Sequence, residues 1–249
     1  MSKIAKNMLP YWKSVIIILA LLVVQAMCDL ALPSYTSDII DVGIQNSGVE
    51  HVVPEKITEE ELQTAQFIMT DDEADVWKNL YKEKDGYYEL KDLSEDKLNQ
   101  ADEELTVPLI MNYQMSAMEV DTFKKSIAAQ MGMDEAQLAD MSVEQIGQMM
   151  HMELESFMQE KKDDDGNKKT VECVDVRGVF SALLQSGAMT KDQIFSMRDD
   201  MEDTIDAMGS SLVKSMGVAY AVSADKAAGV DINQVQKDYL WMSGLKMVG

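Results

Sequence analysis

The longest apolar stretch of the chain lies near its start, at residues 11–32. Within it, residues 15–28 are apolar at every position except Gln25. As a helix, 22 residues span roughly 33 Å, and the hydrocarbon core of a bilayer is about 30 Å thick. The pattern therefore predicts a transmembrane helix that is retained in the protein. A cleaved signal peptide, or a lipoprotein signal ending at Cys28, is the alternative, although no typical cleavage site follows the apolar core.

Charged residues around this stretch predict its orientation. Lys3, Lys6 and Lys13 precede or begin it, and no acidic residue occurs before Asp29. Lysines beside a membrane helix stay on the cytoplasmic side. We therefore expect the N-terminus inside the cell and the chain after Asp29 outside.

Apolar positions between residues 50 and 228 recur mostly at helical spacing. The clearest amphipathic stripe consists of Val176, Val179, Phe180, Leu183 and Leu184. Four pairs match the capping-box signature of a helix start, namely Thr58 with Glu61, Thr70 with Glu73, Ser142 with Gln145, and Thr190 with Gln193. The sequence therefore predicts a mainly α fold, in which this extracytoplasmic part folds on its own because its apolar stripes can bury one another.

Breaks in the helical pattern predict turns and loops. Asp85-Gly86 is typical of a tight β-hairpin turn, so we expect one small hairpin there. Pro108 predicts a helix interruption, followed by an extended segment at residues 109–113. We expect Val143, Ile146, Met150, Leu154 and Phe157 to share one helix face, residues 161–169 to form a charged loop, and Gly187 and Gly209 to end helices.

Composition narrows the possible partners. The formal net charge of the 249 residues is −22, which excludes a nucleic-acid-binding role, since that role needs basic surface. The chain has two cysteines. Cys28 lies in the apolar stretch, and Cys173 lies far from it in the sequence. We therefore expect no disulfide framework, with Cys28 shielded in lipid and Cys173 outside the cell.

A motif follows the apolar stretch. Leu32-Pro33 leads to Asp38-Ile39-Ile40-Asp41-Val42-Gly43-Ile44. Together with the preceding helix, this segment of about 35 residues resembles the outer end of the first transmembrane helix in bacterial ATP-binding-cassette (ABC) exporters, where an L-P step precedes I-I-D-x-G-I.

A second motif lies near the end of the chain. It consists of Gly229-Val230-Asp231, Gln234, Tyr239-Leu240 and Gly244-Leu245-Lys246-Met247. This pattern resembles the start of the second transmembrane helix in exporters that carry a large extracytoplasmic insertion between helices one and two. The resemblance implies that the long apolar run of that helix would follow Gly249, as part of a longer transporter.

The resemblance implies three parts: residues 1–44 as cytoplasmic N-terminus and first transmembrane helix, 45–228 as a helical insertion, and 229–249 as the start of the second helix. It also implies an ATP-driven exporter in a bacterial cell membrane, with residues 45–228 extracytoplasmic, that works as a dimer of half-transporters. Its partners would then be the lipid bilayer, the remaining transporter segments and a second half-transporter. The alternative is a single-pass anchored protein whose acidic extracytoplasmic domain binds a partner.

Because the two motifs would belong to neighbouring helices, we expect Ile44 and Gly229 to lie within roughly the 10 Å spacing of packed helices.

Candidate chemistry within the chain is sparse. It contains no G-x-x-x-x-G-K-[ST] and no H-E-x-x-H, so we expect no catalytic residue and no bound cofactor here; ATP and Mg²⁺ belong to the full transporter by resemblance. An EF-hand-like spacing at residues 161–172 begins with Lys161, a cation where calcium needs a carboxylate. A cluster of soft ligands that could bind Cu(I) consists of Met149, Met150, His151 and Met152. Methionine is also a common core residue, and we favour a packing role for this cluster.

Overall fold

The computed structural model describes residues 12–162 and 168–248, so Lys3 and Lys6 lie outside the described residues. The chain divides into two compact units. One, here called the helix pair, comprises Met1–Glu50 and Asp231–Gly249. The other, here called the inserted domain, comprises His51–Val230. Helices dominate both units, which confirms the predicted mainly α fold.

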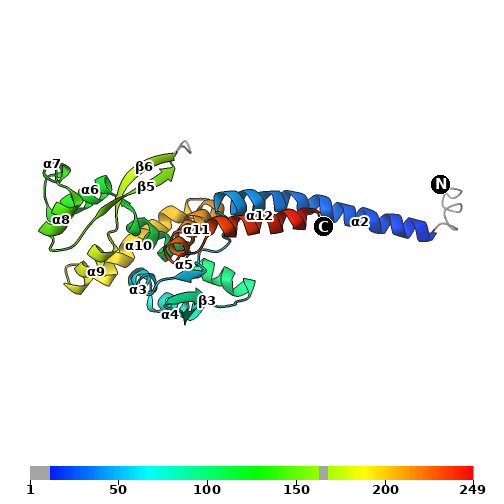
Figure 1. The fold of residues 1–249 in the computed structure, drawn as a ribbon, viewed down its shortest axis with the longest axis horizontal. Helices are drawn as coiled ribbons and strands as arrows, with labels where there is room; N and C mark the ends of the chain where they lie inside the picture. The colour runs from blue at the N-terminus through cyan, green and yellow to red at the C-terminus, as the bar shows by residue number, and fades with distance from the viewer. Residues whose placement is uncertain (1–11, 163–167, 249) are drawn as a thin grey trace. The chain divides into compact units, whose positions relative to one another are not determined.

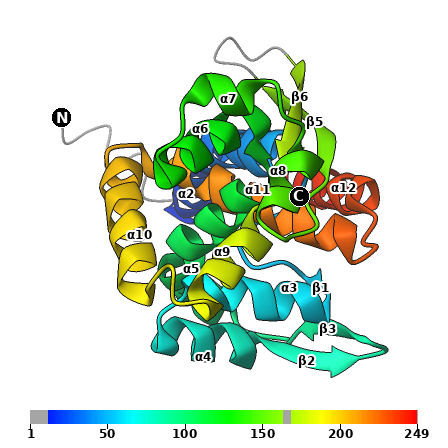
Figure 2. The ribbon, with the colours of Figure 1, turned by 90° about the vertical axis from the view of Figure 1, so that its left-hand side faces the viewer.

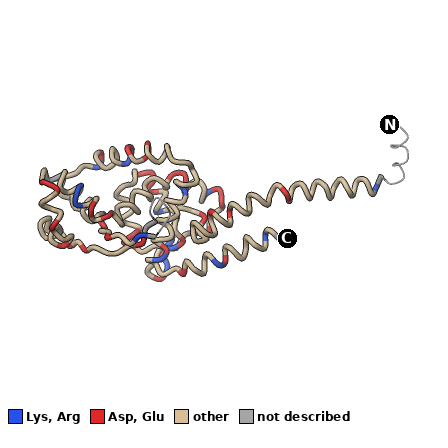
Figure 3. Tube along the Cα trace, turned by 90° about the horizontal axis from the view of Figure 1, so that it is seen from above, with Lys and Arg blue, Asp and Glu red and all other residues tan. Residues whose placement is uncertain are grey.

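The helix pair consists of α2 (Trp12–Asp38), a π-helical turn η2 (Ile39–Gln45) and α12 (Ile232–Val248). α12 contacts both α2 and η2 and runs back beside them in the opposite direction (Figure 1). Among the described residues, Lys13–Gln45 is the one helical span that is long and apolar enough to cross a membrane. Its apolar part forms the long uncharged stretch of α2 in Figure 3.

The inserted domain begins with short elements: β1 (Lys56–Ile57), α3 (Glu59–Thr64), η3 (Ala65–Ile68), α4 (Asp71–Leu80), β2 (Tyr81–Lys84) and β3 (Tyr87–Leu90). The long helix α5 (Glu95–Ser116) follows, and then β4 (Met118–Glu119), α6 (Val120–Met131), α7 (Glu135–Ala139) and α8 (Val143–Met149). The chain continues through β5 (Ser156–Lys162), β6 (Lys168–Val174), α9 (Arg177–Gln185), α10 (Lys191–Asp206) and α11 (Ser210–Ala227).

Two small antiparallel sheets lie at opposite ends of this domain, with α5 between them (Figure 2). The first has strand order β1-β3-β2, and its hairpin turns at Asp85 and Gly86, both with positive φ, as predicted. The second has order β4-β6-β5, with Phe157 opposite Cys173. The sequence pattern did not predict this second sheet.

The core of the inserted domain surrounds α5. Leu105 and Leu109 on α5 are fully buried, as are Trp77 on α4 and Phe123 on α6. A large cluster beneath α6, α8 and α9 includes Phe123, Leu138, Ile146, Val179 and Ile194. A core of this size provides the hydrophobic driving force for folding of the unit.

Two predictions from the sequence were wrong because contacts between distant segments outweighed local preference. α5 continues through Pro108, and residues 109–113 are helical, not extended. Proline inside a helix costs about 3 kcal/mol, but Leu105, Leu109 and Ile110 around it are all buried, and burying each such side chain contributes about 1.5–3 kcal/mol. α8 ends at Met149, so Phe157 lies on strand β5 and does not share the helix face of Val143 and Ile146.

Other breaks were predicted with mixed success. Of the expected charged loop at 161–169, residues 161–162 end strand β5 and residues 168–169 begin strand β6, whereas residues 163–167 lie outside the described residues. Gly187 has positive φ just after α9 and ends that helix as expected. Gly209 has φ −63° and precedes α11 as its N-cap, whereas α10 already ends at Asp206.

Candidate functional site

The two motif segments meet in the helix pair. Gly43 on η2 faces Tyr239 and Leu240 on α12 so closely that a Cβ atom at position 43 would lie 2.5 Å from Leu240 Cδ2. The side-chain amide of Gln236 donates a hydrogen bond of 2.7 Å to the Gly43 carbonyl oxygen. Glycine thus lets the two helices approach closely, a role that small residues commonly have between membrane helices.

A second glycine contact lies just before the inserted domain. Gly48 has φ +83°, and a Cβ there would lie 2.7 Å from Gln236 Cα. Only glycine fits such a backbone contact at positive φ without strain. The segments that precede and follow residues 51–230 are therefore in contact, which agrees with their expected closeness.

The motif Gly229-Val230-Asp231 combines a helix stop with a helix start. Gly229 N donates to the Lys226 carbonyl and Val230 N to the Asp225 carbonyl, which is the Schellman arrangement that ends α11. Asp231 Oδ1 accepts from Asn233 N and Gln234 N and so caps α12. The motif residues therefore have local structural reasons for their positions.

The remaining motif residues are mostly on the surface of the helix pair. Asp41 accepts hydrogen bonds from Ser37 Oγ at 2.9 Å and Gln45 Nε2 at 3.0 Å, along one face of the α2–η2 helix. Leu32, Ile40 and Ile44 are exposed, and a Cβ at Gly244 would meet open space. Pro33 lies inside α2, Asp38 ends it, Ile39 begins η2, and Met247 lies near the end of α12.

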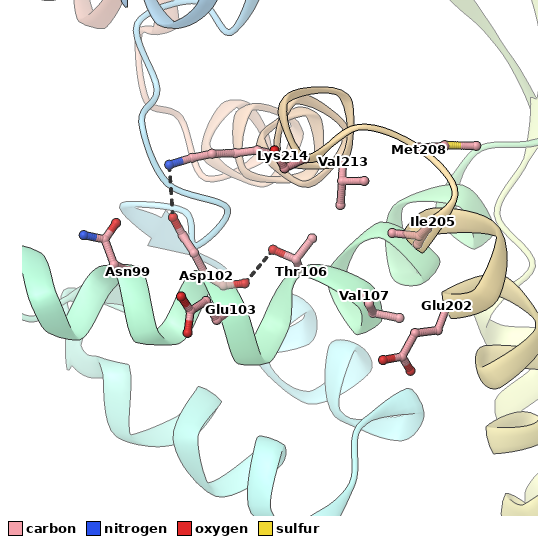
Figure 4. Close-up of a pocket in the computed structure, with 11 residues that line it drawn as sticks. Asn99, Asp102, Glu103, Thr106, Val107, Glu202, Ile205, Met208, Val213 and Lys214 are labelled. Carbon is pink, nitrogen blue, oxygen red and sulfur yellow. Dashed lines mark hydrogen bonds and ion pairs between the residues drawn. The ribbon is translucent and has the colours of Figure 1, made fainter.

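An open groove of about 820 Å³ lies in the inserted domain between α5, α10 and α11 (Figure 4). Its polar lining includes Asp102 and Glu103 on α5, Glu202 on α10 and Lys214 on α11, and its apolar lining consists of Val107, Ile205, Met208 and Val213. The sequence did not indicate this groove, because its residues come from three helices separated along the chain.

Asp102 anchors one wall of the groove. Its carboxylate lies 2.9 Å from His51 Nδ1, accepts from Val52 N at 2.9 Å and pairs with Lys214 Nζ at 3.5 Å. The contact with Asp102 raises the pKa of His51, even though burial acts in the opposite direction. Glu95 also lies 3.5 Å from His51 Nε2. The charge of Asp102 is therefore already balanced within the protein.

The chain contains only two arginines, and both form ion pairs across the inserted domain. Arg177 bridges Asp175 and Glu61, whose other carboxylate oxygen accepts from Asn112. Arg198 makes two hydrogen bonds to Glu73. These ion pairs were not predicted from the sequence. The rarity of arginine, two residues against twenty lysines, could have pointed to them, because arginine suits buried bidentate pairing with carboxylates.

The capping-box pairs show how one signature can serve two purposes. Thr70–Glu73, Ser142–Gln145 and Thr190–Gln193 form complete boxes, as predicted. Thr58 accepts from Glu61 N, but the Glu61 carboxylate binds Asn112 and Arg177 instead of returning to the cap. Glu61 therefore connects α3 to α5 and to the start of α9.

The candidate metal ligands do not assemble into a site. Met149, Met150 and Met152 pack against the hydrophobic cluster, while His151 is exposed at positive φ. The central residues of the EF-hand-like segment, 163–167, lie outside the described residues. Within the described part of the chain, no three His, Cys, Asp or Glu side chains gather as metal ligands would.

Cys28 is exposed on α2, and Cys173 is fully buried in β6. Burial makes Cys173 a poor target for a thiol reagent, whichever side of a membrane it occupies.

No family model matches the chain, and neither a curated protein nor a solved structure matches it. Functional inference therefore rests on the residues themselves and their contacts.

Proposed function

We propose that this chain is the N-terminal membrane-domain portion of an ATP-driven ABC exporter and does not itself contain the nucleotide-binding domain. The observation that carries the proposal is the contact between its two exporter-like motifs. The whole inserted domain lies between Gly43 and Gln236 in the sequence, yet these two residues are joined by a hydrogen bond, and Leu240 packs on Gly43.

This contact has the form that a membrane hairpin with a large insertion requires. The first helix ends, a folded unit intervenes, and the second helix starts beside the first. An insertion is tolerated when its two ends lie close together, because the packing of its host is then undisturbed. The close contact between Gly48 and Gln236 meets that condition, and residues 51–230 form a compact unit of their own.

In this proposal α2 crosses the cell membrane with its N-terminus in the cytoplasm, and the inserted domain is extracytoplasmic. ATP and Mg²⁺ bind elsewhere in the full transporter, which pairs with a second half-transporter. The helix pair contributes packing surface, since exposed apolar side chains such as Ile44, Trp241 and Leu245 remain for other helices or lipid to cover.

The runner-up function is a single-pass anchored protein whose extracytoplasmic domain binds a ligand. The observation that favours it is the groove between α5, α10 and α11. The two functions differ in what accompanies the chain in the cell, because an anchored binder needs neither further membrane helices nor an ATPase.

The deciding experiment begins with the reading frame that continues from codon 249, and with the neighbouring genes. The exporter proposal expects further apolar helices and a G-x-x-x-x-G-K-[ST] sequence there. When co-produced with them and placed in nanodiscs, the complex should hydrolyse ATP in a vanadate-sensitive manner. A stop codon with no such companion gene would overturn the exporter proposal in favour of the anchored binder.

The helix contact has a separate test by disulfide formation in membranes. In a Cys28→Ser background, Gly43→Cys with Leu240→Cys should crosslink on oxidation. A Cβ at position 43 lies 3.5 Å from Leu240 Cγ, close to where a cysteine sulfur would sit, and truncating Leu240 removes the clashing Cδ2. Gly43→Cys with Met242→Cys is the control, since Met242 is exposed. Equal crosslinking of both pairs would remove the main support for the proposal.

A further inference from the structure

The groove between α5, α10 and α11 has the size of a small-molecule site. Its volume of about 820 Å³ falls within the 300–1,000 Å³ that is typical of such sites. Ile205 is almost fully buried, and together with Val107, Met208 and Val213 it gives the groove an apolar wall. A ligand held there would need an apolar segment to cover that wall.

The charges that line the groove are unbalanced. Three carboxylates, those of Asp102, Glu103 and Glu202, face one ammonium group, that of Lys214. Lys214 points to Asp102 (Figure 4) and pairs with it, and Asp102 is further satisfied by His51 and Val52 N. The positive charge in the groove is thus already committed.

The other two carboxylates remain available. Within the described residues, neither the Glu103 nor the Glu202 carboxylate makes a hydrogen bond or an ion pair, and both side chains are exposed. Arg198, one helical turn before Glu202, interacts with the Glu202 carboxylate only electrostatically, because its guanidinium donates its hydrogen bonds to Glu73. Glu103 projects from α5 and Glu202 from α10, so the groove offers two separated anionic positions along an apolar wall (Figure 4).

We propose that this groove binds small dicationic amphiphiles, which are molecules with two cationic groups joined by an apolar linker. The cationic groups pair with Glu103 and Glu202, and the linker covers Val107, Ile205 and Val213. Anionic ligands are disfavoured both by these carboxylates and by the overall charge of −22. This inference goes beyond the proposed function and does not depend on it, because an exporter and an anchored binder could both use the groove.

Both parts of the ligand matter physically. Exposed ion pairs contribute little each because solvent screens them, so two charges alone give weak binding. Burial of an apolar linker adds affinity in proportion to the apolar surface that it removes from water. An amidinium group improves the pairing, since its planar N–H donors match a carboxylate in the bidentate manner of arginine.

The experiment uses the full chain in nanodiscs of zwitterionic lipid and the aromatic bis-amidine pentamidine as the probe. Isothermal titration calorimetry, corrected with empty nanodiscs, should show saturable one-to-one binding. Glu103→Gln with Glu202→Gln should weaken binding roughly tenfold, which is the effect of losing about 1.4 kcal/mol over two ion pairs. Ser210→Lys, at an exposed lining position, should also weaken it by adding a competing cation.

The matched control is Glu83→Gln with Asp203→Asn, which changes the net charge equally at two exposed positions outside the groove. It should bind pentamidine as the wild type does, and the neutral analogue that lacks both amidines should not bind. Circular dichroism checks that each variant is folded. Absence of saturable binding to the wild type, or equal weakening by the control and groove variants, would overturn the proposal without affecting the exporter tests.

Discussion

The helix pair and the inserted domain treat apolar side chains in opposite ways. On α2, Leu21 is 62% exposed and Met27 67%. In the inserted domain, Leu105 and Trp77 are 0% exposed. This difference supports the proposal that α2 lies in lipid, since an apolar surface all round a long helix is stable in lipid but not in water, where only a buried core is.

The two regions also use different contacts. The helix pair joins through a glycine, with Gly43 against Leu240 and a backbone carbonyl bonded to Gln236. The inserted domain adds ion pairs that join distant segments, such as Arg177 with Glu61. If the helix pair lies in the membrane as proposed, close packing matters more there, because lipid provides no hydrophobic drive between helices. Water allows a domain to combine an apolar core with charges that satisfy one another.

The strongest test of this comparison removes a charge from inside the inserted domain. Arg177→Met leaves the Glu61 carboxylate, whose side chain is only 16% exposed, without its cationic partner. Breaking a buried ion pair in this way costs about 3–5 kcal/mol. Urea unfolding followed by Trp77 fluorescence, with Trp12 and Trp241 replaced by Phe, measures the stability of this domain alone.

Two controls sharpen that measurement. Arg177→Met with Glu61→Gln should recover much of the stability, because glutamine still accepts the hydrogen bond from Asn112 without burying a charge. Lys84→Met breaks an exposed pair with Glu89 and should change stability far less than Arg177→Met does, because solvent screens that pair. Equal losses for Arg177→Met and Lys84→Met would contradict the buried role of Arg177.

The second test adds a charge to the helix pair. Leu21→Arg at the middle of α2 should disfavour membrane insertion by about 2.5–3.5 kcal/mol. The fraction of chain that remains in membranes after alkaline carbonate extraction should fall, while Leu21→Ile behaves as wild type. Unchanged extraction of Leu21→Arg would argue against α2 as a membrane span.

The third test concerns glycine contacts, which occur in both regions. In α11, a Cβ at Gly217 would lie 2.6 Å from Cγ1 of Val52, a fully buried and stiff side chain. Gly217→Ala should therefore destabilise the domain by about 1–3 kcal/mol in urea unfolding, and Val52→Ala should relieve part of the clash. Gly178→Ala in α9, where a Cβ meets open space, should instead stabilise by up to about 1 kcal/mol. The same sign for both alanine variants would refute the assigned contact.

The smallest expected effect depends on pH. Burial raises the pKa of Asp225 to about 7, although its carboxylate accepts from Lys56 N. Because this folded-state pKa exceeds the unfolded value near 3.9, folding favours the protonated acid. Stability should then rise as pH falls, by about 1.4 kcal/mol between pH 8 and pH 6.

Asp225→Asn should remove that gain, because the amide is neutral at both pH values and keeps an acceptor for Lys56 N. His51 acts in the same direction, since its raised pKa gives stability that is lost as pH rises through the folded-state value. The decisive quantity is therefore the difference between wild type and Asp225→Asn. An identical pH dependence of the two would show that Asp225 is ionised in the folded state.

Much of the local structure could be predicted from the sequence. The apolar helix, the turn at Asp85-Gly86 and three complete capping boxes were all indicated by residues within a few positions of one another. The second sheet was not, because its strand β5 carries a mixed pattern of Phe157, Met158 and charged residues that has no clear period. Pairing with β6 determines its conformation.

The candidate sites divide in the same way. Motif residues such as Gly43 and Asp231 were identified from the sequence, but the contact of Gly43 with Leu240 required the structure. Nothing in the local pattern pointed to Asp102 or to the groove it lines. Glu61 was interpreted as a cap residue, whereas its carboxylate binds Arg177, 116 positions away.

The sequence by itself determined the mainly α class, the apolar span of α2 and the starts of several helices, because these depend on backbone preferences and hydrogen bonds between near neighbours. Only the tertiary structure decided that α5 continues through Pro108, that β5 joins β6, and that Arg177 pairs with Glu61. Each of these is set by contacts between residues distant in the chain, namely burial around Pro108, strand pairing for β5 and an ion pair for Arg177. Such contacts outweigh the local preferences from which a sequence is interpreted.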